Sequence, residues 1–131
     1  MKFTKMHGAG NDFVVVETSN GRHHWSKLAV AMCDRHYGIG ADGLLLVMPS
    51  KVADFRMRIF NADGSEANAC GNGIRCLVKY FVDKGLAKPR TRKVLVETLA
   101  GVREAEFYKV NGRVAKVKIG MGQPRFSKKD I

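Results

Sequence analysis

The chain has 131 residues, 45% of them hydrophobic, which is enough for one domain with a buried core. It contains no apolar run as long as a membrane span, and its first seven residues lack the apolar core of a signal peptide, so a cytoplasmic protein is expected. The formal net charge of +11 is spread along the chain without the interleaved aromatic residues of a stacking surface, which argues against nucleic-acid binding.

The three cysteines are Cys33, Cys70 and Cys76, and they form neither a C-x-x-C pair nor a disulfide framework. We therefore expect reduced thiols. The four histidines fall in no spacing that would complete a zinc site with these cysteines. The sequence predicts no metal.

Two strands are predicted near the start of the chain, over residues 2–7 and 13–16, on either side of a glycine-rich turn. We favour the interpretation that these glycines serve the geometry of a hairpin. The alternative is that the turn presents Asn11 to a ligand as a side-chain amide.

A helix is predicted next, with Ser26 as its N-cap and an end near residues 37–38. Cys33 lies inside this helix and is expected to pack in the core. The segment 38–43 then reads G-x-G-x-x-G, but a dinucleotide fingerprint follows a strand and opens a helix. This segment instead follows a helix and precedes a strand predicted over residues 44–48, so it supports no nucleotide cofactor.

The next strand is predicted over residues 54–60, where three apolar side chains alternate with two arginines. It leads into a loop of small and polar residues and then into a helix over about residues 72–84. The polar residues of this helix form one narrow stripe, so it is expected to be largely enclosed by other structure. Cys76 lies on its buried side.

Three more strands are predicted over residues 93–98, 102–110 and 113–119, the last two joined by a type I′ turn at Asn111-Gly112. The expected fold class is α+β, with a curved mixed or antiparallel sheet wrapped around a central buried helix. We expect one domain over residues 1–119, followed by the start of a linker over residues 120–131.

Cys70 lies in the loop that leads into the second helix, and Gly71, Asn72 and Gly73 follow it. The start of a helix gathers unpaired N–H groups and the positive end of the helix dipole, which bind anions and lower the pKa of a thiol. A nucleophilic cysteine needs a histidine partner and a redox cysteine needs a second thiol, whereas a general base needs only a suitable pKa and a nearby anion-stabilising site. The base role fits these residues best. Packing among small residues is an equally weighted alternative for Cys70.

Several motifs then occur in a recognisable order. They read Lys5-Met-His-Gly-Ala-Gly-Asn-Asp-Phe13, Gly38-Ile-Gly-Ala-Asp-Gly43, Asn61-Ala-Asp-Gly-Ser-Glu66 with Cys70-Gly-Asn-Gly-Ile-Arg-Cys76, and Met121-Gly-Gln-Pro-Arg-Phe126. Together they closely resemble the diaminopimelate epimerase family, over the whole chain. The resemblance implies interconversion of LL- and meso-diaminopimelate, for lysine and peptidoglycan synthesis, without pyridoxal phosphate or metal.

The resemblance also implies a mechanism in which one cysteine removes the α-proton from one face and a second cysteine donates a proton to the other. By position, Cys70 resembles the first of these cysteines. Asn11 and Asn61 resemble side chains that contact substrate, and the backbone amides of Gly71 and Asn72 resemble half of the α-carboxylate site. Gly43 departs from those family members that have Gln at this position, so one side-chain contact with substrate is expected to be absent or replaced.

Length is the larger departure, because the family has two pseudo-symmetric domains and this chain resembles only the first. The second cysteine has no candidate here. We therefore expect a fragment that needs the C-terminal domain as its partner and is inactive alone, with homodimerisation left open. The alternatives are another cysteine-based amino-acid racemase of the same fold, and a non-catalytic basic module that binds nucleic acid or an acidic protein.

Overall fold

The computed structural model describes residues 2–8, 10–68, 71–87 and 92–120. Its elements are β1 (Thr4–Gly8), β2 (Asn11–Glu17), α1 (Trp25–Cys33), β3 (Gly43–Met48), β4 (Phe55–Asn61), β5 (Glu66–Ala67), α2 (Gly71–Asp83), β6 (Lys93–Thr98), β7 (Gly101–Val110) and β8 (Arg113–Ile119). The strands form one sheet in the order β1-β2-β3-β4-β6-β7-β8, and β5 pairs with β4.

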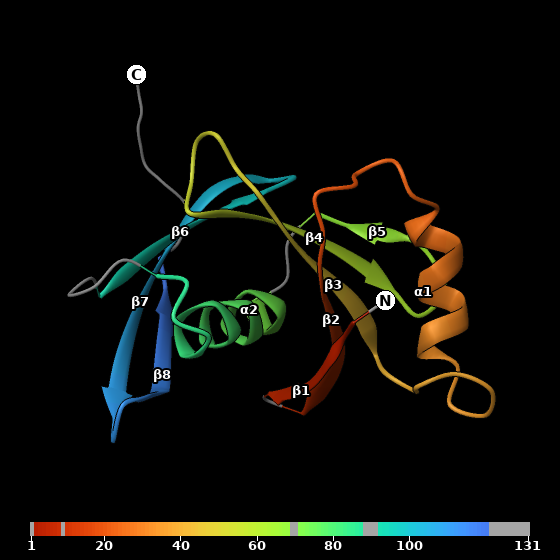
Figure 1. Cartoon of the computed structure of the whole chain (residues 1–131), viewed down its shortest axis with the longest axis horizontal. Coiled ribbons are helices and arrows are strands. Elements are labelled where there is room, and N and C mark those ends of the chain that lie inside the picture. The colour runs from red at the N-terminus through yellow and green to blue at the C-terminus, as the bar shows by residue number, and fades with distance from the viewer. Residues whose placement is uncertain (1, 9, 69–70, 88–91, 121–131) are drawn as a thin grey trace.

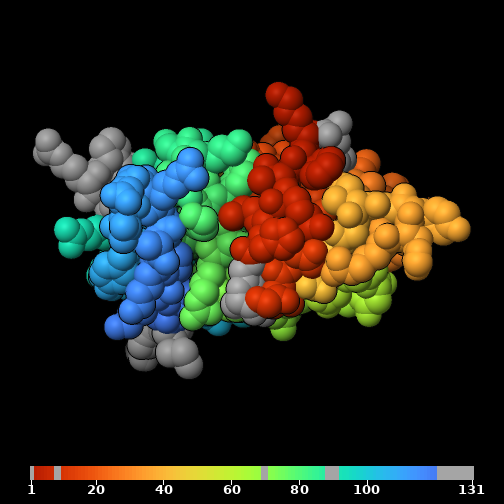
Figure 2. Space-filling model, turned by 90° about the horizontal axis from the view of Figure 1, so that it is seen from below, coloured from red at the N-terminus to blue at the C-terminus, as the bar shows by residue number. Residues whose placement is uncertain are grey.

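The sheet curls around α2, and α1 packs on the opposite face of β3 and β4 (Figure 1). The β2–β3 and β4–β6 pairs are parallel and the other pairs are antiparallel. Viewed from below, α2 lies between β1 and β8 (Figure 2). The predicted curved mixed sheet around a central helix is therefore confirmed.

Because successive side chains of a strand point to opposite faces of the sheet, a separate core forms on each face. Phe13 and Val15 of β2 face α2, whereas Val14 and Val16 face α1. All six residues of β3 are buried, because both faces of this strand are covered. On β4, the three apolar side chains predicted to share a face are all buried, and the two arginines between them are half-buried.

Helix α2 begins at Gly71 and ends at Asp83, within one residue of the predicted bounds. Eight of its 13 residues are buried, including Cys76. Leu77 and Val78 have no exposed surface, and burying side chains of this kind stabilises the fold by about 1.5–3 kcal/mol each. The predicted enclosure of this helix is confirmed.

The predicted bounds of α1 are wrong at both ends. The helix begins at Trp25, because the buried indole packs in the core and its Nε1–H donates to the carbonyl of Asn20 at 2.8 Å. Ser26 is therefore not the N-cap, and its hydroxyl instead donates to the Gly64 carbonyl at 2.5 Å. The helix ends at Cys33, and the Asp34 carboxylate then accepts from the backbone N–H groups of His36 and Tyr37 in a turn. Cys33 itself is buried, as predicted.

Both predicted hairpins, β1–β2 and β7–β8, are present in the structure. Asn111 and Gly112 have φ of 53° and 80°, the left-handed values of a type I′ turn. The β1–β2 hairpin forms, but β2 starts already at Asn11, which pairs with Gly8. The two-residue strand β5 was not predicted.

The described part of the chain contains no helix long and apolar enough to cross a membrane. The predicted linker lies, from residue 121 on, outside the described residues.

Candidate functional site

The first turn of α2 is the start of the candidate site. The helix begins at Gly71, so the N–H groups of its first residues have no partner within the helix. These groups form the positive end of the helix dipole. A helix start of this kind can bind an anion, which is the role that the sequence analysis predicts for it. Cys70 directly precedes Gly71 in the sequence but lies outside the described residues, so its role stays a prediction.

Asn11 and Asn72 are in direct contact, although 61 positions separate them in the sequence. Nδ2 of Asn72 donates to Oδ1 of Asn11 at 2.7 Å, and both residues are half-buried. This bond joins the first turn of α2 to the first residue of β2. The structure thus brings together two residues that the sequence analysis assigned to substrate binding.

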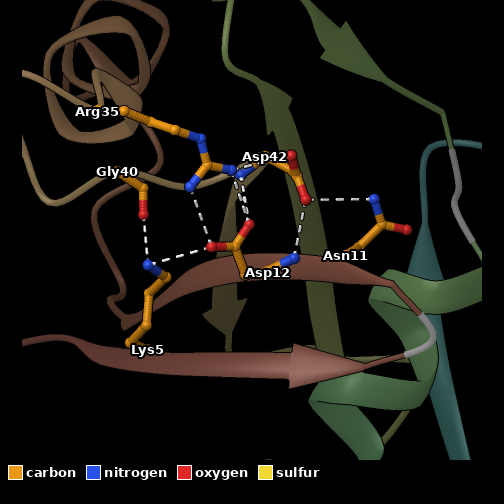
Figure 3. Close-up of polar contacts among 6 residues, drawn as sticks. All are labelled: Lys5, Asn11, Asp12, Arg35, Gly40 and Asp42. Atoms are coloured by element: carbon orange, nitrogen blue, oxygen red, sulfur yellow. Dashed lines mark hydrogen bonds and ion pairs between the residues drawn. The ribbon is translucent and has the colours of Figure 1, made fainter.

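The other end of the Asn11 amide faces a carboxylate (Figure 3). Nδ2 of Asn11 donates to Oδ2 of Asp42 at 3.4 Å, and the same oxygen accepts from the backbone N–H of Asp12 at 2.9 Å. Asp42 precedes β3, so this contact ties the α1–β3 loop to the start of β2.

Two cations hold the Asp12 side chain, which is only 14% exposed. Arg35 donates to both of its oxygens, at 3.0 and 3.3 Å, and Nζ of Lys5 lies 3.2 Å from Oδ2. Arg35 also reaches Oδ1 of Asp42 at 3.2 Å, and Lys5 donates to the Gly40 carbonyl (Figure 3). The Arg35 hydrogen bonds hold the pKa of Asp12 well below its ordinary value, with Asp42 and Lys5 adding to the effect against the opposing effect of burial.

The glycines of the G-x-G-x-x-G segment have a local structural role. A Cβ at Gly38 would lie 2.1 Å from the carbonyl oxygen of Ala31, so only glycine fits as the chain folds back over the end of α1. Gly40 has φ of +83°, which glycine adopts readily. This fold-back brings Asp42 over Asn11. As predicted, the segment follows a helix and precedes a strand.

Asn61 lies at the same end of the sheet, two strands from Asn11. It pairs with Gly43 on β3, and Gly43 pairs on its other side with Phe13 of β2. The Asn61 side chain is exposed and donates through Nδ2 to the Ser65 hydroxyl at 3.0 Å. Asn61 therefore borders the same sheet end, with its amide bonded within its own loop.

Gly43 is buried at the start of β3. A Cβ there would lie 3.1 Å from the Phe60 carbonyl oxygen and 3.4 Å from the Phe13 ring. A larger residue at this position would therefore need a small shift of its neighbours.

Sequence reasoning missed the charged residues that surround Asn11. Lys5, Asp12 and Asp42 all lie inside the motifs quoted above, and Asp12 and Asp42 also lie next to glycine-rich segments, which was the available signal. Arg35 carries no such signal, because it lies in the loop after α1.

Residues 3–127 of the chain match the model of a family described as diaminopimelate epimerase. The chain belongs to the diaminopimelate epimerase family. Curated diaminopimelate epimerases resemble it closely: that of Caldanaerobacter subterraneus subsp. tengcongensis is 56% identical over 131 residues, that of Pelotomaculum thermopropionicum 50% over 134, and that of Methanococcus maripaludis 47% over 132.

In each case the match covers 100% of this chain and 47% of the relative. The chain thus spans about half the length of the diaminopimelate epimerases it matches.

Solved structures of other proteins share the fold. A probable proline racemase from Agrobacterium radiobacter K84, with bound carbonate, has a TM-score of 0.72 at 20% identity, covering 89% of this chain and 40% of its own. A hydroxyproline epimerase from Agrobacterium vitis, with bound trans-4-hydroxy-L-proline, has a TM-score of 0.70 at 18% identity and the same coverage. At these identities the likeness concerns the fold, which agrees with the predicted class.

Proposed function

We propose that this chain forms the N-terminal half of a cofactor-independent diaminopimelate epimerase that interconverts LL- and meso-diaminopimelate in the cytoplasm. The observation that carries the proposal is the family match over residues 3–127, with relatives 47–56% identical. The reaction would serve lysine and peptidoglycan synthesis.

Cys70 is the acid/base of this half-site. As a thiolate it takes the α-proton of one stereoisomer, and the resulting carbanion is neutralised by a proton delivered to the opposite face. The backbone amides of Gly71 and Asn72 hold the α-carboxylate, which gains negative charge as the proton leaves. The start of α2 at Gly71 supports this role, because its first-turn N–H groups are those that a carboxylate would use.

Asn11 and Asn61 contact the substrate through their side-chain amides in this proposal. Their common position at one end of the sheet supports it, as does the bond from Asn72 to Asn11.

Inversion needs a second acid/base, and the remaining cysteines of this chain do not suit that role. Cys33 and Cys76 are buried, at 3% and 4% exposure, in the cores on either side of the sheet. We therefore place the second acid/base in the half of the relatives that this chain does not match. The chain alone should not epimerise its substrate.

The substrate could in principle be that of another racemase with this fold. The relatives at 47–56% identity are diaminopimelate epimerases, whereas the proline and hydroxyproline enzymes are only 18–20% identical. The sequence relatives therefore favour diaminopimelate.

The test is a chimera in which this chain is followed by the unmatched C-terminal half of the Caldanaerobacter relative. It should convert LL- to meso-diaminopimelate and leave L-proline unchanged. Cys70→Ala should lower the rate by roughly 10²–10⁴-fold. Cys33→Ala is the matched control, since it removes a buried thiol, and it should retain activity. A folded chimera that racemises proline, or that is unaffected by Cys70→Ala, would contradict the proposal.

A further inference from the structure

The Asn11 amide lies between two partners of different chemistry. Its Nδ2 faces Oδ2 of Asp42 at 3.4 Å, and its Oδ1 faces Nδ2 of Asn72 at 2.7 Å. We propose that Asp42 is a positioning residue, which sets the orientation of the Asn72 side chain at the first turn of α2 by acting through Asn11. The functional meaning of this orientation rests on the proposed function above, but the coupling itself does not.

Asp42, Asn11 and Asn72 form a relay of hydrogen bonds, and the orientation of its two amides follows from hydrogen-bond chemistry. An ionised carboxylate only accepts, so the end of the Asn11 amide that faces Asp42 is its NH₂ group. The carbonyl oxygen of Asn11 is then turned toward Asn72. The Asn72 amide must in turn present its own NH₂ group to that oxygen.

Three donors converge on the Asp42 carboxylate. Oδ2 accepts from the Asp12 backbone N–H at 2.9 Å and from Asn11, and Oδ1 accepts from Arg35 at 3.2 Å. A carboxamide could serve the two donors on the Oδ2 side with its oxygen, because its NH₂ group would then face only Arg35, whose side chain is 56% exposed and can turn away. Asp42→Asn would therefore keep the contact with Asn11, whereas Asp42→Ala removes both acceptors.

The orientation of Asn72 matters because of its place in the helix. Asparagine side chains near a helix start readily accept hydrogen bonds from nearby backbone N–H groups. In this structure the Asn72 amide is instead tied to β2 through Nδ2. That bond fixes the direction of the Asn72 NH₂ group, beside the first-turn N–H groups that the substrate carboxylate would need.

The coupling is tested by NMR on the ¹⁵N-labelled chain, with the side-chain NH₂ signals of Asn11 and Asn72 assigned by substitution. Asp42→Ala should shift both pairs of signals, although residue 42 has no bond to Asn72. Asp63→Ala is the matched control, since Asp63 is an exposed carboxylate that accepts from Ser65, and it should leave the Asn72 signals in place. Unchanged Asn72 signals in a folded Asp42→Ala chain would overturn the proposal.

If Asp42→Ala does not fold, Asn11→Ala provides the second test, because it removes the residue between Asp42 and Asn72. The Asn72 signals should move in this variant as well, and their constancy would overturn the proposal.

The functional part is tested by kinetics in the chimera. Asp42→Ala should lower kcat/KM by about tenfold. Asp54→Ala is the control for activity, because this exposed carboxylate accepts from the Leu95 N–H at 2.7 Å beside the other end of β4, and it should lower kcat/KM by less than about twofold. An inactive wild-type chimera would count against the proposed function, and the NMR result would still decide the relay. An active chimera whose kcat/KM is insensitive to Asp42→Ala would overturn the positioning role.

Discussion

Asp12 shows how one side chain can join three segments of this fold. It stands on β2, binds Lys5 on β1, and binds Arg35 in the loop after α1. Because its exposure is low, these contacts are screened less than those of a surface ion pair. The carboxylate therefore stabilises the end of the sheet at which the candidate site lies.

Replacing Asp12 by Asn should destabilise the chain in a pH-dependent way. The folded state holds the pKa of Asp12 below its ordinary value of 3.8, chiefly through Arg35. The stabilisation is therefore fully present above that value and is lost as the pH falls toward the folded pKa. Urea unfolding should show a loss of about 1–3 kcal/mol at pH 7, shrinking below about pH 4. Arg35→Gln should reproduce this trend, and a difference that grows as the pH falls would contradict it.

At the scale of elements, the sequence predicts best where the local pattern decides the structure. The bounds of β6 and β8 and the turn at Asn111 match, because strand alternation and a type I′ pair are local signals. The start of α1 was missed because a buried tryptophan extends the helix beyond its apparent cap. The link from Asp42 to Asn72 through Asn11 could not be predicted, because these residues come from three segments that only the fold brings together.

Gly38→Ala should strongly destabilise the α1–β3 loop. The added methyl group would lie 2.1 Å from a backbone oxygen, which cannot move without disturbing α1. Urea unfolding should show a loss above about 2 kcal/mol, typical of overpacking against a rigid neighbour. Gly85→Ala is the control, because its φ of +76° is strained for alanine but a Cβ there meets open space, so its loss should be near 1 kcal/mol. Equal losses in the two variants would contradict this account.

For the whole molecule, the central point is that the described residues to which the proposal assigns substrate binding lie at one end of the sheet. The first turn of α2, Asn11 and Asn61 are at this end, and Cys33 and Cys76 are both buried. The chain spans about half the length of its diaminopimelate epimerase relatives. A proton-transfer reaction that serves both faces of a carbon would then need the other half.

The most direct measurement is exchange of the α-proton of diaminopimelate in D₂O, followed by NMR. The purified 131-residue chain should leave the α-proton in place, and the same chain joined to the C-terminal half of the Caldanaerobacter relative should exchange it while interconverting the LL and meso forms. Epimerisation by the purified chain alone, at a rate near that of the chimera, would contradict the assignment of this chain to one half of a two-base site.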